Sequence, residues 1–258
     1  MKSSVLFVLI LFILTSINVF GQGSKATDPD LLRAFKKIGC WDKMREDTTV
    51  SALDSLYLAN SIFEGKLLQA AAKYPFTVSN FFKSFDDEPL GITTSADGVL
   101  IIYWWDTLTG GTQHAYSCVA QYKTAHGIKS VSPASPNKYS CSYSKIYSLK
   151  SKDKIYYLAV YDEILSYHDR CQGIQIFLID KDDLMPAKLI KTQTGLHSKI
   201  DYLYNDNSMR DQNWENELTY HEKTQTLTIP VALENGNLTD NYITYKFNGE
   251  YFIKLKSK

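Results

Sequence analysis

Residues 99–114 read Val-Leu-Ile-Ile-Tyr-Trp-Trp-Asp-Thr-Leu-Thr-Gly-Gly-Thr-Gln-His, and this stretch indicates the class of fold. It opens with an apolar run, 99–105, that is much shorter than the roughly 20 residues of a membrane span. Such a run suits a β-strand, and the pair Gly110-Gly111 marks a turn after it. We therefore expect antiparallel strands near 98–105 and 112–123.

Turn signals of the same kind recur along the rest of the chain, at Asp97-Gly98, His126-Gly127, Asn235-Gly236 and Asn248-Gly249. The residues between them follow a period of two, as strands do. Further strands are expected near 139–150, 154–162, 173–180, 187–193, 199–204, 225–231, 241–247 and 250–256. No repeat of fixed period is visible, which argues against a full propeller or solenoid. A barrel, a sandwich and partial blades remain open alternatives.

Two helices are expected before the strands. Asp28-Pro29 is typical of a helix start, and the apolar residues that follow it predict a short helix ending at Gly39. Ser51 and Asp54 form a capping-box pattern, after which apolar residues recur at three- and four-residue steps as far as Pro75. The sequence thus predicts an α+β protein, in which a short N-terminal helical segment, 22–85, packs on a large antiparallel β-meander domain, 86–258.

The first residues have the pattern of a cleaved secretory signal peptide. Lys2 precedes an uninterrupted apolar run, 5–14, and the segment closes on Val19-Phe20-Gly21 before Gln22. We expect cleavage after residue 21, and hence an exported protein, periplasmic or secreted. Gln22 stands where a bacterial lipoprotein requires a cysteine, so no lipid anchor is expected, and no later apolar run is long enough for a membrane span.

The charge of the chain limits which partners it can bind, and its cysteine content indicates whether it forms disulfides. The chain has 28 basic and 28 acidic side chains, which argues against nucleic acid as a partner. An even number of cysteines in an exported protein favours disulfides. If the strands around Cys118 and Cys141 fold back on each other near residue 130, these two lie opposite each other, which leaves Cys40 with Cys171. Four free or buried thiols are the alternative.

The densest group of candidate binding residues is Trp104, Trp105, Asp106 and His114. Adjacent residues on a strand point to opposite faces, so one indole can face away from the main core, near Asp106 and His114. Flat aromatic surfaces beside polar groups suit a glycan or a peptide. The alternative is that both tryptophans are buried, one in the sheet core and one under the helical segment.

Recognised catalytic and metal-binding motifs are missing from the sequence. The five histidines are scattered without HExxH spacing, and there is no nucleophile elbow or phosphate-binding glycine loop. The Asp- and Asn-rich segment 204–217 lacks the glycine of a calcium loop. The polar turn 167–170, Tyr-His-Asp-Arg, is expected of any solvated loop and is given no role. We therefore expect no metal and no cofactor.

Two predictions concern strand pairing near the C-terminus. A three-residue loop of Phe247, Asn248 and a left-handed Gly249 pairs Tyr245 with Tyr251 and keeps the apolar residues on one face of the hairpin. A two-residue loop would instead place polar and apolar residues together on both faces. We therefore expect the bulged, three-residue form. Pro230 has no amide hydrogen to donate, so its strand should be at an edge or an end there.

Several strings of the chain resemble those of uncharacterised exported proteins of Bacteroidetes-type bacteria. They are DTLTGGT at 106–112, YSKIYSLK at 143–150, YYLAVY at 156–161, KLIKTQTGL at 188–196 and TYKFNGEYF at 244–252. The resemblance covers roughly residues 90–258 and extends to the end of the signal segment. The resemblance implies no activity and no functional residues. The shared pattern does not require Cys118, Cys141 or Cys171, which suggests that any disulfide they form is a local crosslink of this chain.

The leading hypothesis from the sequence is a non-enzymatic exported protein that binds a ligand or a partner through its β domain. The alternative is a secreted or periplasmic hydrolase whose acid and base come from separate strands, such as Asp106 and His114. A third hypothesis is a structural component of the cell envelope. The identity of the ligand is left open between a glycan and a peptide.

Overall fold

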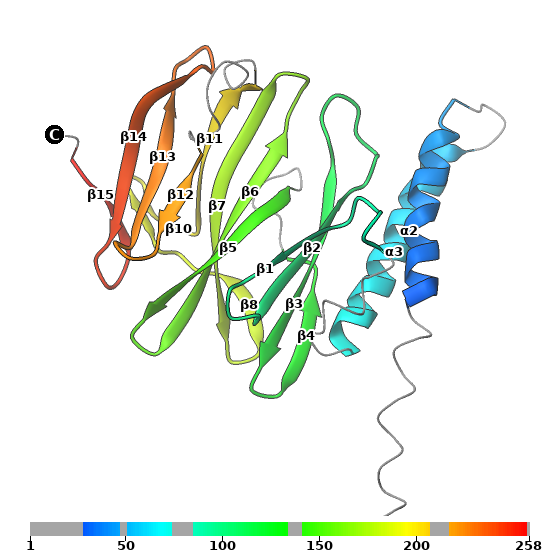
Figure 1. Ribbon diagram of the computed structural model, residues 1–258, viewed down its shortest axis with the longest axis horizontal. Helices are drawn as coiled ribbons and strands as arrows, with labels where there is room; N and C mark the ends of the chain where they lie inside the picture. The colour runs from blue at the N-terminus through cyan, green and yellow to red at the C-terminus, as the bar shows by residue number, and fades with distance from the viewer. Residues whose placement is uncertain (1–27, 47–50, 74–84, 134–140, 207–216, 257–258) are drawn as a thin grey trace, which may run out of the picture.

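The computed structural model describes residues 28–46, 51–73, 85–133, 141–206 and 217–256, and the signal segment lies outside these ranges. Two helices, α2 (Asp28–Lys43) and α3 (Ala52–Lys73), precede a series of strands (Figure 1). The strands are β1 (Gly91–Thr94), β2 (Leu100–Asp106), β3 (Tyr116–Thr124), β4 (Gly127–Val131), β5 (Ser142–Ser151), β6 (Lys154–Ile164), β7 (Asp169–Asp180), β8 (Asp183–Pro186), β9 (Ile190–Thr192), β10 (Gly195–His197), β11 (Lys199–Asn205), β12 (Thr219–His221), β13 (Thr226–Ala232), β14 (Leu238–Phe247) and β15 (Phe252–Lys254).

The strands form three sheets that stack face to face, and the two helices lie against the outer side of the first sheet, at the right of Figure 1. The first sheet has the order β1-β2-β3-β4, the second β11-β7-β6-β5 with β8 beside β7, and the third β10-β9-β15-β14-β13-β12. Their described pairings are antiparallel, except that β15 and β9 run parallel. The α+β prediction is confirmed, and the β part adopts the sandwich arrangement rather than a closed barrel.

Three buried clusters separate the four layers. One lies between the helices and the first sheet, the next between the first and second sheets, and the last between the second and third sheets. The described helices therefore pack on the first sheet through a shared core. Neither helix in the described ranges combines the length and hydropathy that a membrane span requires.

Burial on both faces explains the apolar runs of the central strands. In β2, Leu100 and Ile102 pack toward the second sheet, whereas Ile101 and Tyr103 pack toward the helices. The run 156–161 in β6 is divided in the same way between the two cores on either side of the second sheet. Because side chains alternate between faces, a strand with a core on each side must be apolar at nearly every position.

Helix α2 continues four residues beyond the predicted end at Gly39. Trp41, in the added turn, packs against the core under the helices. That contact offsets the helix-weakening effect of a glycine, which is about 1 kcal/mol. The second helix agrees with its prediction, and Ser51 contacts the Asp54 carboxylate at its start.

The last hairpin differs from both registers considered for it. Phe247 pairs with Phe252 across a four-residue loop, 248–251, and Tyr245 pairs with Lys254 instead of Tyr251. The side chain of Asn248 accepts hydrogen bonds from the amides of residues 250 and 251, at 2.9 Å each, and Gly249 has the expected positive φ, +100°. The prediction was wrong because it placed Phe247 in the turn, whereas Phe247 and Phe252 are both buried in the core.

Pro230 lies near the end of β13. The described ladder between β13 and β12 stops at Thr228, so β13 is unpaired on that side at Pro230, as predicted.

Five short strands were not expected: β1, β4, β8, β10 and β12. Of these, β4 bears on the predicted disulfide between Cys118 and Cys141, which assumed that β3 pairs with the strand at 142–151. Instead, β3 turns back into β4 at residues 125–126, and the strand at 142–151 joins another sheet.

The disulfide prediction is therefore corrected. Cys40, Cys118, Cys141 and Cys171 are all free thiols in the structure. Cys118 in β3, Cys141 just before β5 and Cys171 in β7 share the core between the first two sheets, but β3 and β5 belong to different sheets and do not pair as assumed. Burial raises the pKa of the Cys118 and Cys171 thiols to about 12, and that of Cys141 in the same direction. These are inert core residues rather than reactive thiolates.

Candidate ligand-binding site

Asp106, the last residue of β2, organises the loop that joins β2 to β3. One oxygen of its carboxylate accepts a hydrogen bond from the Leu108 amide at 2.8 Å, and the other lies 2.5 Å from Nδ1 of His114. Leu108 has a positive φ of 58°, which is uncommon for a branched side chain. The carboxylate thus holds both ends of a strained loop.

Contacts on two sides hold this loop between layers. Arg45, just after α2, donates a hydrogen bond to the Gly110 carbonyl at 3.1 Å and pairs with Asp42 at 3.0 Å. On the other side, the His114 amide donates to the Ile164 carbonyl at the end of β6, at 3.1 Å. A Cβ on Gly110 would lie 2.0 Å from the Gln113 carbonyl oxygen, so the tight turn requires glycine. The loop therefore connects the helical layer to the second sheet.

The tip of the β6–β7 hairpin faces the same region. Arg170 donates to the Ser166 carbonyl at 2.7 Å and pairs with the Asp206 carboxylate at 3.1 Å. The Asp206 amide in turn donates to the His168 carbonyl at 2.8 Å. The Ser166 hydroxyl donates to Asp169 at 2.8 Å. These bonds hold the tip in one conformation, next to the end of β11.

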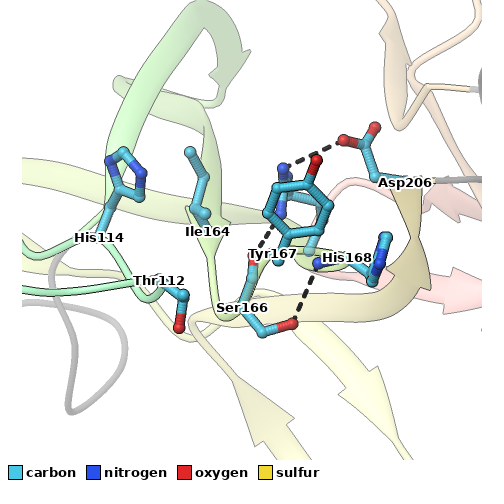
Figure 2. A pocket seen from close by; sticks show the side chains of 8 residues that line it. Thr112, His114, Ile164, Ser166, Tyr167, His168 and Asp206 are labelled. Carbon is cyan, nitrogen blue, oxygen red and sulfur yellow. Dashed lines mark hydrogen bonds and ion pairs between the residues drawn. The ribbon is translucent and has the colours of Figure 1, made fainter.

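A cavity of about 290 Å³ lies between the loop and the hairpin tip. Figure 2 shows His114 on one side of it and Tyr167, at the tip, on the other. Tyr167 is 70% exposed, and its ring meets the ring of His168 edge to face, with centroids 4.6 Å apart. The lining residues are Thr112, His114, Ile164, Ser166, Tyr167, His168, Arg170 and Asp206. An exposed aromatic ring thus stands beside a row of hydrogen-bonding groups.

The charges around the cavity are largely compensated. His114 contacts Asp106, and Arg170 contacts Asp206, so this imidazole and this guanidinium each already have an acidic partner. Tyr116 stacks on His114 at 6.1 Å, and burial together with the nearby Asp106 carboxylate raises the pKa of this tyrosine to about 12. Tyr116 therefore stays neutral across the physiological range. The site offers donors and acceptors without a marked excess of either charge.

Two further cavities continue along the loop. One of about 250 Å³ includes Asp106, His114 and Arg45, and the next, of about 520 Å³, shares Asp106 and Leu108 with it. The largest of the three runs along α2, where Phe35 and Ile38 form part of its wall. Neighbouring cavities share lining residues, so the three lie one after another around the loop, and together they are called the track.

The sequence-predicted residues divide into two groups. Asp106 and His114 come together as proposed and line the track. Trp105 was wrongly assigned to a binding surface, because it is 0% exposed, beneath α3, where its indole nitrogen donates to Asn60 at 3.0 Å. Trp104 is half-buried on the opposite face, donates to Thr93 at 3.3 Å and does not line these cavities. The buried alternative thus holds for Trp105.

Sequence reasoning missed Tyr167, His168, Arg170 and Asp206 as lining residues. The turn 167–170 was noticed for its polar and aromatic composition, but only the stacking of the second sheet on the first brings it next to the β2–β3 loop. Within the described ranges, no group of three or more His, Cys, Asp or Glu residues is arranged to hold a metal ion.

The fold and the cleft define an α+β protein of stacked antiparallel sheets that carries a polar cleft where the loops of two sheets meet. No family model matches the chain, and no match was found among curated proteins or solved structures.

Proposed function

We propose that this chain is an exported binding protein that holds a neutral glycan in the cleft between the β2–β3 loop and the β6–β7 tip. The observation that carries the proposal is the exposed ring of Tyr167 beside the compensated pairs of His114 and Arg170. Export is supported by the pattern of the first 21 residues alone.

A neutral, hydroxyl-rich ligand suits these groups better than an ion. The apolar face of a sugar ring can lie on a tyrosine ring, while hydroxyls exchange hydrogen bonds with imidazole, guanidinium and carboxylate groups. An anion would gain little from an arginine and a histidine that already contact carboxylates at 3.1 and 2.5 Å. A peptide remains the second outcome of the test.

The track of three cavities favours an oligosaccharide over a single sugar. Their volumes, about 290, 250 and 520 Å³, follow one another past His114 and Asp106. A chain of several sugar units would contact more of this track than a monosaccharide. Affinity should therefore rise with ligand length until the track is filled.

The test is a glycan and peptide array probed with the chain from residue 22 onward. Tyr167→Ala should abolish the signal from the glycans that bind the unaltered chain. Tyr242→Ala, which removes an exposed tyrosine on β14 in the third sheet, is the matched control and should leave the signal intact. Binding to peptides alone, or binding that Tyr167→Ala does not change, would refute the proposal.

A hydrolase is the second candidate, and the 2.5 Å contact between Asp106 and His114 favours it. A carboxylate can orient a histidine as a general base. Against this reading, the Ser166 hydroxyl donates to Asp169 and accepts from the amides of His168 and Asp169, so it is already engaged away from His114. Release of products from bound glycans that His114→Gln abolishes would favour the hydrolase over simple binding.

A further inference from the structure

The cavity along α2 differs in character from the polar cavity at the hairpin tip. It measures about 520 Å³, within the range of small-molecule sites, which is roughly 300–1,000 Å³. Its apolar wall comes from two residues of α2 and two residues beside it: Phe35, Ile38, Pro89 and Leu108. One end of the track is therefore lined by hydrogen-bonding groups, and the other end offers apolar surface.

Most of the charges that line this cavity are already engaged. Lys36 and Glu88 form an ion pair at 3.0 Å, and the Asp106 carboxylate contacts His114 and the Leu108 amide. Lys43, in the last turn of α2, is different, because no carboxylate of the described residues lies within ion-pair distance of its ammonium group. It can donate a hydrogen bond to an oxygen of a bound molecule.

Gly39 lies in the middle of the row of α2 residues that faces the cavity. Phe35, Gly39 and Lys43 line the cavity at four-residue steps, so they follow one line along the helix. Glycine weakens a helix, and the backbone does not require it here, because its φ is not positive. A Cβ on Gly39 would meet no atom within 4 Å, so packing does not require glycine either. What the missing side chain provides is open space in the cavity.

We propose that this cavity receives an acyl chain carried by the bound glycan, so that the ligand of the track is an acylated glycan. The inference rests on the proposed function, because it names the part of the same ligand that lies beyond Asp106. The sugar units contact Tyr167 and His114, and the chain lies along α2 against Phe35 and Leu108.

The direction of the chain follows from the order of residues along α2. Lys43 is the lining residue closest in sequence to Arg45, which lines the neighbouring cavity of the track. The carbonyl that joins the chain to the sugar can therefore accept a hydrogen bond from Lys43, while the chain continues past Gly39 to Phe35. This row is roughly 12 Å long, which suits an acyl chain of medium length.

The first test is calorimetric titration of decanoate, a medium-length carboxylic acid, into the chain from residue 22 onward. Decanoate should bind, and Gly39→Leu should weaken its binding by about tenfold or more, because the new side chain fills the middle of the cavity. The matched control is Gly65→Leu in α3, where a Cβ likewise meets no atom within 4 Å and which lines none of the three cavities. This variant should bind decanoate as the unaltered chain does.

Urea denaturation separates a filled cavity from a damaged fold. Leucine is a better helix former than glycine, so both glycine variants should unfold at a urea concentration at least as high as the unaltered chain. Gly39→Leu should therefore lose affinity without losing stability.

A second pair of variants tests the polar end of the cavity without altering its shape. Lys43→Gln should weaken decanoate binding several-fold, because the carboxylate loses its cationic partner. Lys37→Gln removes an exposed lysine of α2 that does not line the cavity, and it should leave the affinity unchanged.

No saturable decanoate binding up to about 1 mM would overturn the proposal, as would equal affinities of Gly39→Leu and Gly65→Leu. The proposed function fails separately. Decanoate binding that Gly39→Leu weakens, together with an array on which no glycan binds, would support the acyl site and refute the glycan. Glycan binding without decanoate binding would refute the acyl chain alone.

Discussion

Single side chains decide how firmly the candidate site is held in place. Asn60 is buried in α3 and makes hydrogen bonds to Leu56, Thr107 and Trp105. It thereby connects the helix, the start of the β2–β3 loop and the strand that precedes this loop. The pairing of Asp106 with His114 was within reach of the sequence, because eight residues with a two-glycine turn bring them back together. The role of Asn60 was not, because nothing local links it to residue 107.

Asn60→Ala should lower the free energy of unfolding by about 2 kcal/mol, since it leaves the Trp105 indole N–H and the Thr107 carbonyl without their partner in a buried place. Urea denaturation measures this change. Gln69→Ala, at an exposed position of the same helix, should change it by less than about 0.5 kcal/mol. Similar values for the two variants would mean that Asn60 has no such structural role.

At the scale of elements, the burial of large side chains decided strand pairing where it disagreed with the local alternation of polar and apolar residues. The period-two alternation placed the main strands correctly, because it reflects which face of a strand meets a core. It misplaced the last hairpin, where Phe247 and Phe252 pack with ring centroids 5.2 Å apart. The short strands β1, β4, β8, β10 and β12 were missed, because three to five residues carry too little periodicity to be recognised.

The observed register of this hairpin predicts unequal effects of two neighbouring substitutions. Phe252→Ala should cost about 3–4 kcal/mol, because Phe252 is fully buried against Phe247 and Tyr220. Tyr251→Ala, in the turn, should cost less than about 1 kcal/mol. Chemical denaturation of both variants measures the difference. A larger loss for Tyr251→Ala would support the three-residue loop with Tyr251 opposite Tyr245.

At the scale of the whole molecule, the candidate cleft exists because the second sheet stacks on the first. The β2–β3 loop belongs to the first sheet and the β6–β7 tip to the second, and the two meet through the bond from the His114 amide to Ile164. Apolar runs such as 156–161 revealed strands, but not that cores lie on both faces. With no fixed repeat, nothing in the sequence defined which sheet packs on which. The sequence could therefore predict only the part of the site that lies in the β2–β3 loop, and not the part at the β6–β7 tip.

The stacked cores also bury many tyrosines, and this burial predicts that the free energy of unfolding falls at alkaline pH. Burial raises the pKa of Tyr103, Tyr157, Tyr161 and Tyr202 above the ordinary value of 10.0, and the Asp97 and Asp201 carboxylates reinforce the shifts of Tyr157 and Tyr161. The folded state keeps these protons while the unfolded chain releases them, so the stabilisation is complete below pH 10 and is lost as the pH rises above it.

Chemical denaturation at a series of pH values checks this effect. The free energy of unfolding should fall from about pH 10 upward, and Tyr161→Phe should make the fall less steep, because one shifted group is gone. A free energy of unfolding that stays constant to pH 11, or an identical slope in the variant, would contradict the assignment.

The central claim is that the Tyr167 side of the cleft binds a glycan. The most direct measurement is calorimetric titration of the best oligosaccharide from the array into the unaltered chain, Tyr167→Ala and Tyr242→Ala. We predict that Tyr167→Ala weakens binding by about tenfold or more, equivalent to about 1.4 kcal/mol, while Tyr242→Ala matches the unaltered chain. Equal affinities for all three proteins would contradict the claim.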